Sequence, residues 1–375
     1  MRIGIDARFY GSVGKGLGRY TQKLIENLEK ISTPYGNRYF IFLRKENWEE
    51  YQPQNNNFTK VLADIPWYSV REQIIFPRIL KRLNLDLVHF PHFNVPYFYS
   101  GKFVVTIHDL ILFHFPTRRA STLSPLFYRL KLAAYKIVIK NAVRNARAIL
   151  AVSEHTRKDI LKHFKTNPDK VFVTHEAVDL LPAIPSDLPR QEVLKKYGIM
   201  KPYILYVGNA YPHKNLDVLA TAFREVIRKH PLLRLVLVGK EDYFYRRLKK
   251  FVGDGKIKNI IFAGFVGDNY LPIVYQEAQA YIFPSLYEGF GLPPLEAMRE
   301  GTPVISSESS CLPDILGEAA YYFDPKAAGE IAEAIEKALI DKELREKLIS
   351  AGRRQIKKYN WEKMARETLK VYETA

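Results

Sequence analysis

The chain alternates short apolar runs with helical stretches, and this alternation is what most constrains its fold. In residues 1–180 the apolar runs are rich in branched residues and have the length of buried strands. They lie at residues 3–7, 39–43, 85–90, 102–110, 148–153 and 170–175. Strands that alternate with helices pair in parallel through right-handed crossovers, so this part of the chain predicts a doubly wound sheet.

A proline-rich break at residues 181–202 divides the chain, and the same alternation restarts after it. The expected strands of the second half lie at residues 203–208, 234–239, 259–264, 280–283, 303–307 and 319–323. A length of 375 residues exceeds the size at which single cores stop growing. The sequence therefore predicts an α/β protein with two doubly wound, Rossmann-like domains at 1–180 and 203–358, joined by a linker at 181–202. A helix at 359–375 is expected to pack back on the first domain.

Open α/β sheets bind ligands beyond the carboxyl ends of their strands, so the residues that follow each strand are the first candidates for a site. The strand at 280–283 runs into a glycine-containing loop and then into Pro293 and Pro294. Proline suits the first turn of a helix, and a helix start attracts anions such as phosphate. Glu288 and Glu296 bracket the loop, and we expect Glu296 in the first helical turn. The alternative is an ordinary strand-to-helix turn around a buried Phe290.

Three further strand ends carry candidate residues. Lys214 follows the strand at 203–208 near a helix start, where its charge could neutralise a diphosphate. His108 ends the fourth strand and could form a hydrogen bond at the floor of a cleft. Gly16 lies in a glycine-rich loop that has neither the dinucleotide fingerprint nor the P-loop ending. That loop either lets a phosphate approach the backbone or is an ordinary turn.

We expect no metal at the site, because no two aspartates stand two residues apart to form an Asp-x-Asp clamp. His89 and His92 have no cysteine or carboxylate at ligand spacing beside them, which favours structural roles. The one cysteine, Cys311, excludes an internal disulfide and fits a reducing cytosol. No apolar run approaches the length of a membrane-spanning helix.

The net charge of +17 is unevenly placed, because residues 110–150 contain no acidic residue. The basic residues of this stretch include Arg118, Arg119, Arg129 and Lys131, with apolar and aromatic residues between them. Such a segment can lie on an anionic membrane surface. The alternative is a helix packed on the core with a solvated basic side. Nucleic-acid binding is disfavoured, because no recognised nucleic-acid module accompanies the charge.

An ordered set of sequence blocks resembles the retaining glycosyltransferases of family 4, which have the two-domain GT-B fold. The clearest block is EGFGLPPLEAM, in which Glu288 and Glu296 have the E-x7-E spacing. The others are TIHDL, AVSEHTRKDI, VGNAYPHKN, FAGFV and CLPDILGEAAYYFDP, in family order. The resemblance covers nearly the whole chain. It implies an acceptor-binding first domain, a second domain that binds a nucleotide sugar, and a cleft between them.

The resemblance also implies roles for individual residues. His108, Glu288 and Lys214 would be catalytic, with Lys214 on the diphosphate and Glu288 on the hydroxyls of the transferred sugar. Glu296 would hold the donor's ribose. The full expected donor-binding set is Gly16, Asn209, Lys214, Val266, Glu288, Gly289, Phe290, Gly291, Leu292 and Glu296. The chain departs from a common family pattern at Asn209, where many members have arginine, so half of the usual cationic clamp is in question. His213 and Arg19 are the candidates to replace the missing charge.

These observations together predict a retaining, metal-independent glycosyltransferase without a cofactor. The blocks around residues 70–110 resemble polysaccharide mannosyltransferases, which favours GDP-mannose as donor and a glycan or lipid-linked glycan as acceptor. We expect a cytoplasmic protein that is peripheral on the inner face of the membrane, with Arg118, Arg119, Arg129 and Lys131 at the membrane or acceptor. Two alternatives remain open: a nucleotide-sugar epimerase of the same fold, and a non-catalytic protein that binds lipid or nucleic acid.

Overall fold

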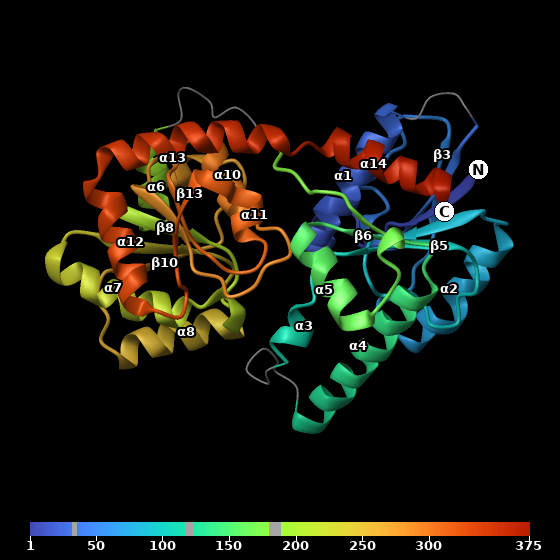
Figure 1. Ribbon diagram of the computed structural model, residues 1–375, viewed down its shortest axis with the longest axis horizontal. Helices are drawn as coiled ribbons and strands as arrows, with labels where there is room; N and C mark the ends of the chain where they lie inside the picture. Colours follow the sequence, from blue (N-terminus) through green and yellow to red (C-terminus); the bar gives the residue numbers. More distant parts are fainter. Residues whose placement is uncertain (32–35, 117–123, 180–188) are drawn as a thin grey trace. The chain divides into compact units, whose positions relative to one another are not determined.

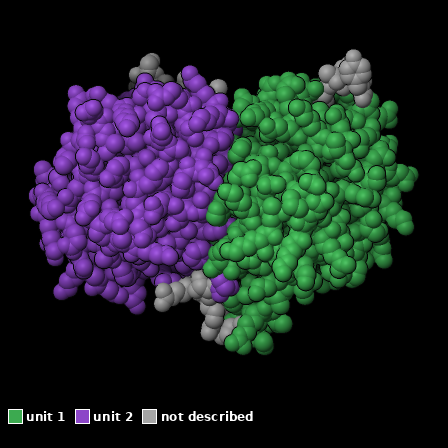
Figure 2. All heavy atoms as spheres, in the orientation of Figure 1, with its two compact units in different colours: residues 1–114, 123–176, 360–375 green, residues 115–122, 177–359 purple. Residues whose placement is uncertain are grey.

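The chain divides into two compact units, each built on one parallel sheet (Figures 1 and 2). Unit 1 comprises residues 1–114, 123–176 and 360–375, and unit 2 comprises residues 115–122 and 177–359. The computed structural model describes residues 1–31, 36–116, 124–179 and 189–375. Within the described residues, no helix is both long enough and apolar enough to cross a membrane.

Unit 1 has a seven-stranded sheet in the order β3-β2-β1-β4-β5-β6-β7, in which every neighbouring pair is parallel. Its strands are β1 (Arg2–Asp6), β2 (Arg38–Leu43), β3 (Phe58–Leu62), β4 (Leu87–Phe90), β5 (Phe103–Ile107), β6 (Ala148–Ala151) and β7 (Val171–Val173). Its helices are α1 (Lys15–Ile31), α2 (Val70–Arg82), α3 (Ile111–His114), α4 (Pro125–Asn145), α5 (Glu154–Phe164) and α14 (Trp361–Thr374). The apolar faces of α2, α4 and α5 pack with strands β4 to β7 in one continuous core.

Unit 2 has a six-stranded parallel sheet in the order β10-β9-β8-β11-β12-β13. Its strands are β8 (Tyr203–Val207), β9 (Arg234–Val238), β10 (Ile260–Gly264), β11 (Ala280–Phe283), β12 (Val304–Ser307) and β13 (Ala320–Phe323). Its helices are α6 (Arg190–Lys196), α7 (Leu216–Lys229), α8 (Tyr243–Asp254), α9 (Leu271–Gln276), α10 (Leu292–Arg299), α11 (Leu312–Leu316), α12 (Ala328–Ile340) and α13 (Lys342–Gln355). The α6 helix forms within the stretch expected to be a linker and contacts α9.

The predicted α/β architecture with two doubly wound sheets is confirmed. All six expected strands of each half are present within a few residues of their expected ends. The structure adds β3, whose residues at 58–62 include the polar Thr59 and Lys60 and lie at the edge of the sheet. An edge strand that is half exposed lacks the continuous apolar run of the central strands, which is why the sequence did not indicate it.

The order of the strands creates a switch point in each sheet, where successive strands extend in opposite directions from the middle. In unit 1 this point lies between β1 and β4, and in unit 2 it lies between β8 and β11. The loops that leave these strands diverge, so a crevice opens at the carboxyl ends of the two strands. Any ligand site of unit 2 is therefore expected where the chain leaves β8 and β11.

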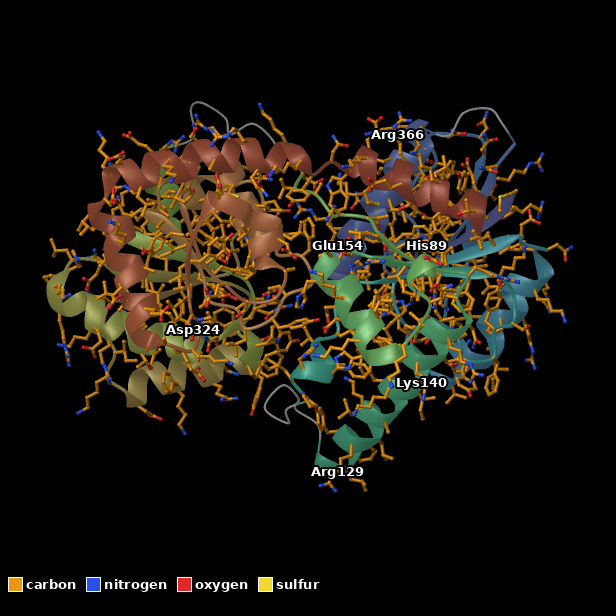
Figure 3. The ribbon with its side chains drawn as sticks, in the orientation of Figure 1. His89, Arg129, Lys140, Glu154, Asp324 and Arg366 are labelled. Atoms are coloured by element: carbon orange, nitrogen blue, oxygen red, sulfur yellow. The ribbon has the colours of Figure 1, made fainter. Side chains whose placement is uncertain are left out.

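The last helix belongs to the unit formed by the start of the chain. Helix α14 begins after Asn360, whose side chain accepts a hydrogen bond from the Lys363 amide, and it packs against α1 (Figure 1). The hydroxyl of Tyr372, fully buried, lies 2.6 Å from Nδ1 of the buried His89 on β4. The other ring nitrogen of His89 lies 2.8 Å from the hydroxyl of Thr106. His89 is labelled among the side chains of unit 1 in Figure 3.

Candidate active site

The loop that follows β11 ends at a left-handed glycine. Gly291 has φ 94° and ψ 57° and precedes the first residue of α10. A Cβ atom at this position would lie 2.9 Å from a methyl carbon of Leu312, so both conformation and packing require glycine here. Pro293 and Pro294 lie in the first turn of α10, which confirms the expected helix start. The expectation that Glu296 lies in the first turn is wrong, because the helix already begins at Leu292 and its first turn contains no acidic residue.

Lys214 and Glu288 meet at the switch point of unit 2. Lys214 ends the short 3₁₀ helix η5 (Pro212–Lys214) that follows β8, and Glu288 lies in the loop that follows β11. The Lys214 ammonium donates a hydrogen bond to Oε1 of Glu288 over 2.6 Å. Both side chains are largely buried, with exposed fractions of 12% and 10%. Burial strengthens the attraction between the two charges and also removes their hydration, so each group depends on the other for compensation of its charge.

The surrounding residues fix the two partners. The Glu288 amide donates to the hydroxyl of Ser310, and the Leu286 amide donates to the carbonyl of His213. The Lys214 ammonium also lies 5.3 Å from the centroid of the Phe283 ring, within the range of a cation–π interaction. The two loops are thus joined by backbone and side-chain bonds before any ligand is present.

His213 does not replace the cation that Asn209 fails to provide. Burial, with the charge of Lys214 beside it, lowers the pKa of His213 to about 4, so its ring is neutral near pH 7. Asn209 is exposed, and its side-chain oxygen accepts a hydrogen bond from the Tyr211 amide. Its role in the structure is therefore to hold the turn after β8, and Lys214 carries the positive charge of this loop.

The remaining expected donor-binding residues of unit 2 lie in three places. Glu296 points from the second turn of α10 and accepts a hydrogen bond from the hydroxyl of Tyr275 over 3.1 Å. Phe290 is buried, and its ring packs edge-on against Tyr359 at 5.3 Å between centroids. Val266, after β10, is also buried. Phe290 and Val266 can therefore reach a ligand only through their backbone, whereas Gly289 and Leu292 are half-buried.

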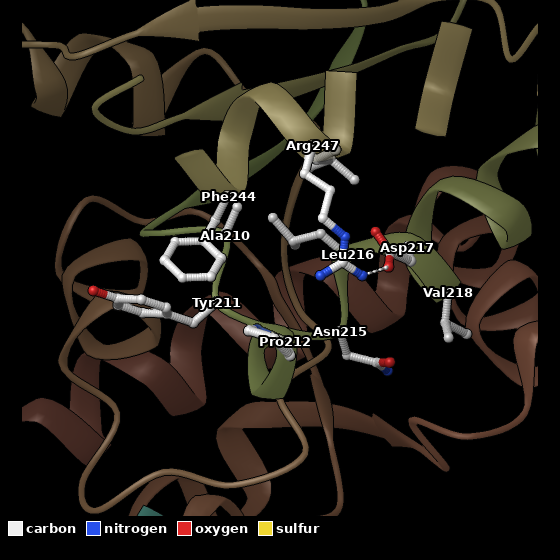
Figure 4. A pocket seen from close by; sticks show the side chains of 10 residues that line it. Ala210, Tyr211, Pro212, Asn215, Leu216, Asp217, Val218, Phe244 and Arg247 are labelled. Carbon is white, nitrogen blue, oxygen red and sulfur yellow. Dashed lines mark ion pairs between the residues drawn. The ribbon is translucent and has the colours of Figure 1, made fainter. Parts of the chain in front are cut away.

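A separate pocket of about 330 Å³ lies beside the turn that carries Lys214 (Figure 4). Its wall includes the rings of Tyr211 and Phe244, and Arg247 forms a 3.8 Å ion pair with Asp217 at its rim. Neither Lys214 nor Glu288 lines it. The chemistry that the two charged residues offer therefore lies outside this hollow, at the strand ends.

In unit 1, His108 lies just after β5 and faces two acceptors. Its Nδ1 lies 2.9 Å from Oε1 of Glu176, and its Nε2 lies 2.9 Å from the carbonyl oxygen of Pro91. A neutral imidazole has only one N–H, so two acceptors favour the doubly protonated ring. Burial alone would lower the pKa of His108, but the hydrogen bond and charge of Glu176, with the Pro91 carbonyl, raise it above its ordinary value. The edge of the ring contacts Tyr20, with centroids 4.7 Å apart.

Sequence reasoning missed Glu176 as a partner of His108. Glu176 follows β7 at the same edge of the sheet, and it directly follows the expected strand at 170–175. The signal was available, since a carboxylate at the carboxyl end of a parallel strand is a candidate for the same reason as His108. The alternation of strands and helices in the sequence does not show that only β6 lies between β5 and β7 in the sheet.

Gly16 lies in the first turn of α1, and its surroundings differ from those of its neighbouring glycines. A Cβ atom on Gly14 or Gly18 would lie 2.0 or 2.1 Å from a carbonyl oxygen, which the fold does not permit. Apart from its two chain neighbours and the backbone of its own helix, no described atom lies within 4 Å of a Cβ built on Gly16. Packing thus explains Gly14 and Gly18, and leaves open space in front of Gly16.

Of the four expected membrane or acceptor residues, Arg118 and Arg119 lie outside the described residues. Arg129 and Lys131 are exposed on α4, and Figure 3 shows Arg129 near the start of this helix and Lys140 further along it. The exposed side of α4 also carries large apolar residues: Leu126, Phe127, Leu130 and Ile137 are all more than half exposed.

Family profiles match both halves of the chain. The family described as glycosyltransferase family 4 matches residues 14–180, and the family described as glycosyl transferases group 1 matches residues 189–355. The chain belongs to the family 4 glycosyltransferases. The family resemblance of the sequence blocks is thereby confirmed, and the E-x7-E carboxylates of this glycosyltransferase are the pair that brackets the start of α10.

Relatives extend over most of the glycosyltransferase. An O-antigen chain mannosyltransferase B of Escherichia coli is 28% identical over 95% of this chain and 95% of its own. An O-antigen chain mannosyltransferase of Salmonella typhimurium is 27% identical over 72% of this chain and 70% of its own.

Solved structures share the fold of the glycosyltransferase. A sucrose-phosphate synthase of Thermosynechococcus elongatus aligns with a TM-score of 0.77 and 20% identity over 100% of this chain and 98% of its own. A glycosyltransferase of Rickettsia africae aligns with a TM-score of 0.71 and 19% identity over 100% of this chain and 97% of its own. The two parallel-sheet units therefore form the GT-B fold.

Proposed function

We propose that this glycosyltransferase transfers mannose from GDP-mannose to a growing glycan, with retention of the anomeric configuration and without a metal ion. The observation that carries the proposal is the buried Lys214–Glu288 pair at the switch point of unit 2. Two relatives named as O-antigen mannosyltransferases, one of which matches 95% of the chain, support the sugar and the class of acceptor.

Lys214 would stabilise the leaving group. As the bond between the sugar and the diphosphate breaks, negative charge develops on the diphosphate. A fixed cation and the N-terminal amides of α10 then lower the barrier without reorganisation, which is how preorganised donors act. One cation at the end of η5 and one helix start would perform the task for which other sugar transferases use a bound metal.

Glu288 would hold the transferred sugar, since a carboxylate accepts hydrogen bonds from sugar hydroxyls. Its bond to Lys214 ties the position of the sugar to the position of the diphosphate. Glu296 would accept hydrogen bonds from the ribose of the nucleotide, with its carboxylate oriented by Tyr275. The two glutamates thus act as holders, and the incoming hydroxyl attacks the face of the sugar that the diphosphate leaves, with the departing phosphate taking its proton.

The acceptor is proposed to be lipid-linked, with α4 on the anionic inner surface of the cell membrane. Helix α4 contains no acidic residue, and its described exposed side carries Leu126, Leu130 and Ile137 beside Arg129 and Lys140. On a helical projection these apolar residues form one stripe, with basic residues along its flank. Apolar residues that enter the boundary between headgroups and acyl chains, flanked by cations that meet anionic headgroups, are typical of interfacial helices.

The test of the activity is a panel of nucleotide sugars supplied with membrane-extracted lipid-linked glycan. We expect transfer from GDP-mannose in the presence of EDTA, and the anomeric configuration of the product to match that of the donor. The variant Glu288→Gln keeps the shape of the side chain and should lower kcat/KM strongly. Conversion of the donor to an epimer without acceptor would instead favour the epimerase alternative, and activity that is lost on chelation and restored by Mg²⁺ would overturn metal independence.

A further inference from the structure

Three side chains of unit 1 gather at the contact between α3 and α5, away from the strand ends. His114 is the last residue of α3, and Asp159 and His163 lie on α5. Nε2 of His114 lies 2.5 Å from one carboxylate oxygen of Asp159, and Nε2 of His163 lies 3.8 Å from the other. One ligand atom from each of the three residues lies within 4.8 Å of the others.

The spacing of Asp159 and His163 matches the period of a helix. Residues four apart project from the same side of an α-helix, so both side chains face the end of α3. His114 comes from a separate element and completes a three-sided arrangement. Donors from two elements at a helical spacing of four are typical of sites in which a metal ion joins two segments.

The distances suit an ion of the size of Zn²⁺. Ligand atoms at about 2.0 to 2.2 Å from a tetrahedral ion lie about 3.3 to 3.6 Å from one another. The two imidazoles lie 2.5 and 3.8 Å from different oxygens of the Asp159 carboxylate, on either side of this range, and one ligand atom of each residue lies within 4.8 Å of the others, so binding requires the ligand atoms to adjust around the ion. Two imidazoles and one carboxylate are also the donor set of several zinc sites that keep a fourth position for water.

The two imidazoles are more exposed than the carboxylate, which suits binding of an ion from solution. The Asp159 side chain is 8% exposed, whereas His114 and His163 are 29% and 27% exposed. An ion could therefore reach the imidazoles from the solvent and complete its contacts on the buried carboxylate. The ring of Phe113 lies 5.2 Å from that of His163 and 5.4 Å from that of Phe164, which supports the base of the cluster.

We propose that His114, Asp159 and His163 form a site for one divalent transition-metal ion of the Zn²⁺ type, separate from the transfer site. Nitrogen donors select Zn²⁺, Ni²⁺ or Co²⁺ over Mg²⁺ and Ca²⁺, which require oxygen ligands. The ion would join α3 to α5. Because Thr156 of α5 also donates a hydrogen bond to the backbone carbonyl of His108, α5 would then hold both ends of the segment from His108 to His114.

The test uses the full chain, stripped of metal by chelation and dialysis, and measures Zn²⁺ binding by equilibrium dialysis together with Tm. We expect about one Zn²⁺ per chain and a rise in Tm of about 5 °C at a hundredfold excess over Kd. Co²⁺ should bind with visible absorption bands that report its coordination geometry, and Mg²⁺ should raise neither signal. His163→Ala and Asp159→Asn should each abolish the bound ion.

The matched control is His230→Ala, which removes a partly exposed histidine at the end of α7 in unit 2 and should leave the stoichiometry unchanged. Circular dichroism establishes whether each variant is folded, and Asp159→Asn preserves the volume of the buried side chain in case His163→Ala is unstable. Binding that persists in both variants, or a folded parent chain that binds no Zn²⁺ under these conditions, would overturn the proposal. Because neither readout uses turnover, the result is independent of the proposed transfer reaction.

Discussion

The ammonium of Lys214 donates a 2.6 Å hydrogen bond to the carboxylate of Glu288, which lies 74 residues further along the chain. The pair connects the ends of two adjacent central strands, β8 and β11, and both of its members are largely buried. Each of the two side chains thus holds the other in place before a ligand binds to either of them. The geometry also means that removal of either side chain leaves the remaining charge poorly compensated.

Replacement of Lys214 by methionine should lower kcat for transfer by more than weaker binding of the donor alone would explain. The methionine keeps the aliphatic stem and removes the charge that meets the leaving diphosphate. Loss of one preorganised donor costs about 10² to 10³ in kcat. Steady-state kinetics with the preferred donor measure the effect. The control is Lys249→Met, which breaks the exposed pair of Lys249 with Glu241 on the same unit and should leave kcat unchanged. Equal losses in the two variants would contradict the assignment.

The two glycines of the first turns of α1 should separate packing from ligand approach. Gly18→Ala would place a methyl group 2.1 Å from the carbonyl oxygen of Gly11, so we expect a clear loss of Tm. Gly16→Ala meets no described atom outside its own helix and chain neighbours, and alanine is favoured over glycine in a helix by about 0.5 to 1 kcal/mol. The Gly16 variant should therefore be at least as stable as the parent while its KM for the donor rises. An unchanged KM would remove Gly16 from the donor site.

The stability of unit 1 should fall as pH rises through the pKa of His108. The pKa of His108 is raised in the folded state, so protonation of its ring stabilises the folded protein. This stabilisation is complete below the pKa of the unfolded state, about 6.5, and is lost as pH rises through the pKa of the folded state. Burial lowers the pKa of His89 and of His92 to about 3. These two residues therefore destabilise the folded protein as pH falls below 6.5, and they do not affect the change above that pH.

Urea unfolding at pH 6 and pH 8 measures this effect, with Glu176→Gln as the comparison. The variant removes the carboxylate that raises the pKa of His108. Its free energy of unfolding should therefore fall further below that of the parent at pH 6 than at pH 8. A difference that is the same at both values, or larger at pH 8, would show that the imidazole is neutral in the folded protein.

Removal of positive charge from α4 should weaken binding to anionic vesicles and spare turnover on a short soluble acceptor. The variant Arg129→Gln/Lys140→Gln changes two exposed residues beside the apolar stripe of α4, each worth about 1 kcal/mol near an anionic surface. Co-sedimentation with vesicles that contain phosphatidylglycerol measures binding, and salt should reduce it. The matched control is Lys342→Gln/Lys347→Gln on α13, which removes the same charge from exposed positions of unit 2. Equal binding by the two double variants would place the membrane contact elsewhere.

The sequence was sufficient for the sheets but not for the contacts between their ends. Runs of branched apolar residues identify central strands, because both faces of these strands are buried. The Lys214–Glu288 contact depends on the order of strands in space, which the alternation alone does not specify. The buried network in which Arg8 bonds to Asp6 and Glu72 was missed for the same reason, since 64 residues separate Arg8 from Glu72.

The place of α14 has a consequence for how the protein forms during synthesis. Unit 1 lacks the helix that covers α1, and His89 lacks the hydroxyl of Tyr372, until residues 361–374 have left the ribosome. The larger segment of unit 2, residues 177–359, is made in the interval between Glu176 and α14. At roughly 5 to 20 residues per second this delay lasts on the order of ten to forty seconds. The unit whose sheet is translated first is thus the last to be completed, and a nascent chain stalled before residue 361 would expose the uncovered face of α1 to chaperones and proteases.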